Sequence, residues 1–127
     1  ADQRETIRQQ LASTFERFLR DASTVDDVDD ADTDDFQFDT LTATNVQYLY
    51  DSGAGTLSRD DNATSPQLLL RNLISFDFNY FDTSGTQLSE PVASSAEDTI
   101  RVVEVTATVT LGNETITVSD AAFLRNL

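Results

Sequence analysis

Apolar residues recur every three or four positions in the first part of the chain. They are Ile7, Leu11, Phe15, Phe18 and Ala22, with Leu19 beside them. Residues spaced in this way share one stripe of an α-helix. Arg4 and Arg8 fall on or beside this stripe near its start. The pattern predicts an amphipathic helix within residues 1–22, which packs its stripe on the rest of the domain and leaves the core near Arg8.

A strongly acidic stretch follows the predicted helix. Nine Asp and no basic residue lie between Asp21 and Asp39, both included. A run of like charges favours solvent over a packed interior. We therefore expect residues 23–35 to form a solvated acidic loop.

Beyond this stretch the hydrophobic pattern changes to a period of two, which is typical of strands with one buried face. The predicted strands cover residues 36–38, 46–50, 74–80, 100–111 and 115–124. Turn sequences separate several of them, at residues 51–55, 82–85 and 112–113. Residues 66–73 fit a short helix or a turn, and residues 90–99 fit a polar loop.

These elements predict an α+β fold, in which an N-terminal amphipathic helix packs on antiparallel β-sheets. Residues 36–127 supply the β-rich part, as two sheets or as one strongly bent sheet. A chain of 127 residues is long enough for one domain with one core. We expect residues 1–127 to form that single domain.

The charge of the chain narrows its possible partners. It has 23 acidic and 8 basic residues, a formal net charge of -15, and its basic residues are all Arg. Phosphate groups would be repelled by most of such a surface, so nucleic acid is not an expected partner. An acidic surface without Lys is typical of proteins from salt-rich environments, and an ordinary acidic extracytoplasmic domain is the alternative.

The residue types present argue against an enzyme. The chain has no Cys and no His, so it lacks thiol nucleophiles and imidazole bases. Carboxylates such as those of Asp60, Asp61, Asp77 and Asp82 could serve acid/base chemistry. So many Asp are present, however, that solvated surface charge is the simpler interpretation. We predict no catalytic residues and no cofactor.

The acidic run is the one place where the sequence hints at a metal. Hard cations such as Ca²⁺ take clustered carboxylate oxygens, which makes Asp26, Asp27, Asp29 and Asp30 candidate ligands. The run lacks the glycine and the terminal glutamate of an EF-hand loop. A flexible run must also be ordered before it can bind tightly.

Several segments together resemble a family. They are residues 15–21, 46–50 with 57–59, 68–73 leading into 74–82 with Gly85 behind, 100–103 and 123–127. This set resembles the minor pilins and pseudopilins, above all the J-type minor pseudopilin of type II secretion systems and the W-type minor pilins of type IV pili. The resemblance implies a pilin-like fold and a structural role at or near the tip of a filament.

The resemblance also implies where such a subunit works. Its relatives have an apolar N-terminal helix that sits in the inner membrane before assembly and packs in the filament core afterwards. We expect this apolar half to lie upstream of Ala1 in the parent protein. The implied partners are other minor pilins or pseudopilins, and the implied location is the periplasm or cell surface. The helix face of Ile7, Leu11, Phe15, Phe18 and Leu19 would continue the assembly helix while packing on the sheet.

Two other classes of function stay open. One is a secreted β-rich binding or adhesion module that uses Ca²⁺ through its Asp run. The other is a hydrolase that works through paired Asp side chains.

Overall fold

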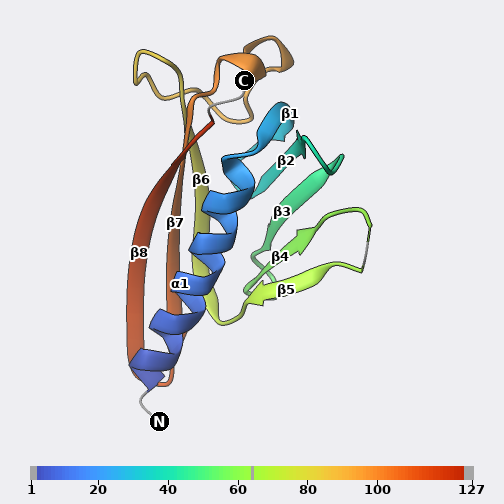
Figure 1. Ribbon diagram of the computed structural model, residues 1–127. Helices are drawn as coiled ribbons and strands as arrows, with labels where there is room; N and C mark the ends of the chain where they lie inside the picture. Colours follow the sequence, from blue (N-terminus) through green and yellow to red (C-terminus); the bar gives the residue numbers. More distant parts are fainter. Residues whose placement is uncertain (1–2, 64, 125–127) are drawn as a thin grey trace.

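The computed structural model describes residues 3–63 and 65–124, and it places an N-terminal helix against two antiparallel sheets (Figure 1). The elements are α1 (Gln3–Ala22), β1 (Val25–Ala31), β2 (Asp35–Thr40), β3 (Val46–Asp51), β4 (Thr56–Asp60), β5 (Gln67–Leu70), β6 (Leu73–Phe81), the 3₁₀ helix η1 (Ser94–Thr99), β7 (Val102–Leu111) and β8 (Glu114–Phe123). Strands β1 to β5 form one sheet in sequence order, and β6 to β8 form the other. The predicted α+β class, with an N-terminal helix and antiparallel sheets, is confirmed. Residues 1–2 of the predicted helix and 125–127 of the C-terminal pattern lie outside the described residues.

Helix α1 buries the face that its sequence predicts. The side chains of Ile7, Leu11 and Phe18 are 1–2% exposed, while Arg4 and Glu5 in the first turn are exposed. At the other end, the Ser23 hydroxyl donates a hydrogen bond of 2.7 Å to the carbonyl of Arg20. This bond satisfies one of the last carbonyls of the helix, which have no partner within the helix itself.

The predicted acidic loop at residues 23–35 is wrong, because residues 25–31 form strand β1. Its pairing with β2 shifts register twice, between Val25 and Asp27 and between Val28 and Asp30. Each shift inserts one extra residue, which changes the period of the buried side chains from two to three. Val25, Val28 and Ala31 therefore all face the core, and the Asp pairs between them face solvent or lie partly exposed.

Strands β4 and β5, neither of which the sequence predicted as a strand, complete the larger sheet. Residues 66–73, for which the sequence favoured a short helix or a turn, contain β5, which pairs antiparallel with β4. The apolar run from Leu68 to Leu70 has no clear period and so does not by itself indicate a strand. The segment forms a strand because it pairs with the edge of β4. The remaining predicted strands appear as β2, β3, β6, β7 and β8, and the polar loop at 90–99 includes η1.

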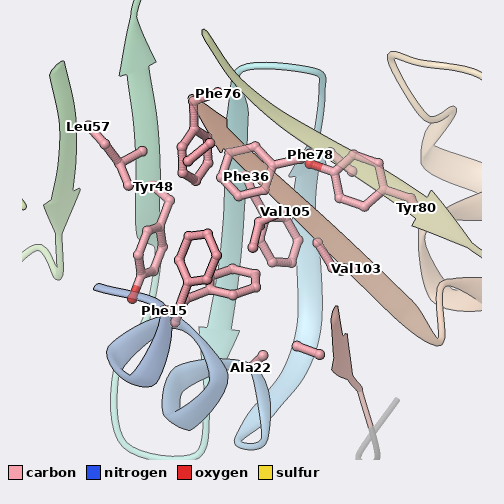
Figure 2. Close-up of a cluster of buried hydrophobic side chains, with 14 of the residues drawn as sticks. Phe15, Ala22, Phe36, Tyr48, Leu57, Phe76, Phe78, Tyr80, Val103 and Val105 are labelled. Atoms are coloured by element: carbon pink, nitrogen blue, oxygen red, sulfur yellow. The ribbon is translucent and has the colours of Figure 1, made fainter. Parts of the chain in front are cut away.

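An aromatic core joins the helix to both sheets, and Figure 2 shows Tyr48, Phe36 and Phe78 within it. The Phe18 ring lies edge-on to that of Tyr48 on β3, with centroids 5.3 Å apart, and 6.0 Å from that of Phe78 on β6. Phe36 on β2 lies 5.9 Å from Phe78, across the gap between the sheets. One cluster of buried residues thus holds all three parts of the fold together.

Backbone hydrogen bonds fix the position of one sheet against the other. The amide of Phe78 donates to the carbonyl of Thr33 at 2.9 Å, and the amide of Leu73 donates to that of Gly55 at 3.0 Å. Gly55 has φ of +66°, and a Cβ there would lie 2.9 Å from the Leu73 carbonyl oxygen. Glycine is needed at this contact because a side chain would push the two sheets apart.

Candidate functional site

The helix face predicted for assembly is almost wholly used inside this domain. Ile7, Leu11, Phe15 and Phe18 are at most 5% exposed and pack on the sheets. Leu19 is only half-buried and borders the surface. The sequence-predicted residues therefore come together as core, and only Leu19 reaches an outer surface.

Three carboxyl groups converge where β1 pairs with β2. Oxygen atoms of Asp27, Asp29 and Asp39 all lie within 4.8 Å of one another. The register of the strands places Asp27 directly opposite Asp39, and the bulge after Val28 places Asp29 beside them. Of the candidate calcium ligands, Asp27 and Asp29 belong to this group, while Asp26 and Asp30 do not. Asp39 replaces them, a residue that the sequence placed on a separate strand.

The crowding of these carboxyls changes their titration. Desolvation, the hydrogen bond with Asp39 and repulsion from Asp39, Asp27 and Glu97 together raise the pKa of Asp29 to about 6. Desolvation and repulsion from Asp35 and Asp32 also raise the pKa of Asp30. Asp29 therefore takes up a proton under mildly acidic conditions. Chemically, the group can hold that proton, or it can offer three oxygens to a hard cation.

A second cluster of polar side chains lies at the C-terminal end of α1. Arg59 on β4, 8% exposed, donates from Nε to Asp21 Oδ2 at 2.7 Å and from Nη2 to Asp21 Oδ1 at 3.2 Å. The Tyr48 hydroxyl donates to the same Asp21 Oδ2. Desolvation, with the nearby Asp21 charge, raises the pKa of Tyr48, which keeps its proton. The sequence did not predict this cluster; the available signal was the single Arg59 between Leu57 and the acidic pair Asp60 and Asp61. Asp61 Oδ2 also lies 3.7 Å from Arg59 Nη1.

An apolar depression lies between α1 and β8. Its lining residues are Arg8, Leu11, Ala12, Phe15, Glu16, Leu19, Val118 and Asp120, and its volume is about 390 Å³. We call this the α1–β8 groove. Leu19 also borders a smaller hollow of about 240 Å³, next to Ala122 and Phe123. Phe123 is 61% exposed, so apolar surface continues from the groove to the end of β8.

Within residues 3–63 and 65–124, α1 and the other helical segment both fall short of the length and apolarity that crossing a bilayer requires. Comparison with known proteins found no family model, no curated protein and no solved structure that matches this chain.

Proposed function

We propose that this chain is a structural subunit that works by assembling with other subunits, as minor pilins and pseudopilins do. Its free energy of assembly would come from burying complementary surface rather than from making bonds. Its place would be at or near the tip of a secretion pseudopilus or a type IV pilus, beside other minor subunits.

One observation carries this proposal: the way α1 meets the sheets. The helix comes first in the chain, lies along the three-stranded sheet, and has the larger sheet on its other side (Figure 1). Its buried stripe starts at Ile7, and the first turn stands clear of the core, where Arg4 pairs with Glu114 on the surface. A longer helix in the parent protein could continue from this turn without disturbing the packed domain.

The coding sequence upstream of Ala1 tests the proposal most cheaply. We expect a short basic leader, a Gly at the cleavage point and a run of about 20 apolar residues that continues into α1. An upstream sequence without the apolar run removes the filament role.

A direct test uses the full parent protein in its own cells. An epitope tag inserted at the exposed turn that contains Ser52 leaves the core untouched. The tagged protein should appear in filaments sheared from the cell surface and should label near one end in immunogold electron microscopy. A tagged protein that is present in cells and absent from sheared filaments counts against the proposal.

The alternative function, a calcium-dependent binding module, has the convergence of Asp27, Asp29 and Asp39 in its favour. A specific ligand raises the melting temperature by mass action. Under this alternative, CaCl₂ raises the melting temperature more than NaCl of equal ionic strength does, and Asp39→Asn removes the difference while Asp26→Asn keeps it. Equal shifts in the two salts remove the calcium-dependent alternative.

A further inference from the structure

The two sheets differ in how well their edges are protected against pairing with another chain. Open edges are normally blunted by bulges, charges, short length or a covering segment. Edge strand β1 has two bulges and four Asp. Edge strand β5 has only four residues, and its pairing with β4 is shifted. The outer edge of β6 is covered, because Phe78 bonds to Thr33 and Leu88 bonds to Tyr80 through backbone groups.

Edge strand β8 is less protected: among the described residues no strand pairs with its outer edge, and its charged side chains are Glu114 and Asp120. It has ten residues, and all ten pair with β7 without a register shift. It contains no Pro, Gly or Lys. Directly after β8, the amide of Leu124 donates a hydrogen bond to the carbonyl of Arg101. Backbone groups alternate in direction along an antiparallel strand, so the even-numbered residues of β8 direct theirs toward β7. The amides and carbonyls of odd-numbered residues, among them Thr117 and Ser119, therefore point outward from the sheet.

The α1–β8 groove runs along the inner side of this open edge. Arg4 Nη1 lies 2.8 Å from Glu114 Oε2, which sets the start of the helix level with the start of the strand. With rises of about 1.5 Å per helical residue and about 3.3 Å per strand residue, Ala12 is level with Val118. Both residues line the groove. Arg8 and Glu16 stand one helical turn before and after Ala12, on the same flank of the helix.

We propose that β8 pairs antiparallel with β8 of a second copy of this chain, about a twofold axis at Val118. The two three-stranded sheets then form one continuous sheet, and the two α1 helices run antiparallel over the joined grooves. Such an isologous contact fits the groove, because the same apolar surface meets itself. Small Ala12 at the centre lets the two helices approach closely.

Charge complementarity supports a second copy as the occupant. A twofold axis at the level of Ala12 and Val118 sets Arg8 of one copy opposite the partner's Glu16 and the partner's Asp120. Arg8 forms no ion pair with any residue that the structure describes, whereas Arg4, Arg17, Arg20 and Arg59 do. In the dimer, Arg8 gains the partner's Asp120 and the partner's Glu16 as counter-ions, and this Glu16 also pairs with Arg20 of its own chain.

The distribution of charge over the molecule favours the same surface. Helix α1 and strand β8 together contain four Arg and five acidic residues, a net charge of −1 in a chain of −15. They are Arg4, Arg8, Arg17 and Arg20, with Glu5, Glu16, Asp21, Glu114 and Asp120. Two copies therefore approach with the least repulsion on this side. This inference is independent of the proposed filament role.

Sedimentation velocity tests the dimer directly. In about 0.15 M NaCl, which screens the interfacial ion pairs only in part, the mass should double from 14.0 kDa as the concentration rises from about 1 µM to about 1 mM. Arg8→Glu should weaken the dimer about tenfold or more, and Arg8→Glu with Glu16→Arg should recover part of that loss. Arg71→Glu, the same change at an exposed site outside the groove, should leave the affinity within about twofold. A chain that stays monomeric over this range overturns the proposal, even if β8 pairs with a strand of a different protein.

A cross-linking variant locates the contact. The chain has no Cys, so Val118→Cys introduces the sole thiol, which lies opposite its own copy across the axis. Under mild oxidation it should form a disulfide dimer much faster than Ser52→Cys, whose thiol lies in an exposed turn. A dimer that forms normally in Arg8→Glu, or equal cross-linking of both Cys variants, overturns the proposed surface. Circular dichroism spectra that match the unmodified chain show that each variant is folded.

Discussion

At the scale of single residues, Asp21 links the end of α1 to two strands of the larger sheet. It sits in the last turn of α1 and accepts hydrogen bonds from Arg59 on β4 and Tyr48 on β3. Both Arg59 and Asp21 are largely buried, with side chains 9% and 13% exposed. A two-pronged bond between guanidinium and carboxylate is directional. It therefore fixes the end of the helix on the larger sheet in one orientation.

Removing this anchor should be costly. Asp21→Asn leaves the largely buried Arg59 charge with only the longer contact of 3.7 Å to Asp61. We therefore expect a loss of about 2–4 kcal/mol in the free energy of unfolding, measured by urea denaturation. Arg20→Ala is the matched control, since the Arg20–Glu16 pair is exposed on the same helix, and it should cost less than about 0.5 kcal/mol. Equal effects of the two changes would show that the buried pair does not hold the helix.

Asp29 gives the protein a dependence on pH. Its folded pKa is about 6 against a usual value of 3.8, so the folded state binds this proton more tightly than the unfolded state. The stabilisation is complete below a pH of about 3.8 and is lost as the pH rises through about 6. We expect Asp29→Asn to flatten this slope and to raise the melting temperature at pH 7 by about 3 °C, allowing for solvent screening.

The control for this change is Asp26→Asn. It removes the same charge from the same strand, at a site outside the cluster of Asp27, Asp29 and Asp39. Melting temperatures measured from pH 4 to pH 8 should differ in slope between the two variants. Parallel curves for both would show that Asp29 titrates like any surface carboxyl.

At the scale of elements, α1 is held by what it packs on rather than by its own sequence. The Phe18 ring meets Phe36, Tyr48 and Phe78, which come from β2, β3 and β6. A single side chain thus contacts both sheets. Most helical stability in proteins comes from such tertiary packing. The orientation of α1 relative to both sheets depends on this contact.

Truncating that side chain should loosen the whole element. Phe18→Ala removes a ring that is 2% exposed, and we expect a loss of about 3–5 kcal/mol in the free energy of unfolding. Leu41→Ala, at a side chain 71% exposed, should change it by less than about 0.5 kcal/mol. Urea denaturation followed by circular dichroism measures both. A small effect of Phe18→Ala would mean that the aromatic core re-forms around the gap.

At the scale of the whole molecule, self-repulsion opposes folding. The chain carries a net charge of -15, and its acidic side chains crowd on β1, β2 and the segment around η1. Desolvation and repulsion from Asp30 and Asp27 raise the pKa of Glu97 on η1, which shows that this crowding reaches across elements. Salt shortens the range of such repulsion.

Salt should therefore stabilise the fold. We expect the melting temperature to rise by about 5–10 °C between about 0.1 M and about 2 M NaCl, because screening weakens repulsion mainly in the compact state. Choline chloride at equal ionic strength should act similarly if screening is the cause. A melting temperature that is independent of salt would show that the folded and unfolded chains feel the same repulsion.

The sequence by itself determined the elements whose patterns are regular. The period of the apolar residues predicted α1 and the strands β2, β3, β6, β7 and β8, because side-chain direction in a single helix or strand depends only on local geometry. It also predicted the buried stripe from Ile7 to Phe18. The expected family, function, partners and location remain predictions.

Only the tertiary structure decided the rest. The two bulges of β1 exist because pairing with β2 buries Val25, Val28 and Ala31 despite the Asp pairs between them. The Asp21–Arg59 pair joins residues 38 positions apart, and the carboxylates of Asp29 and Asp39 come together from two strands. The open edge of β8 likewise follows from which strands find partners. Such features depend on the free energy gained between distant segments, which no local pattern records.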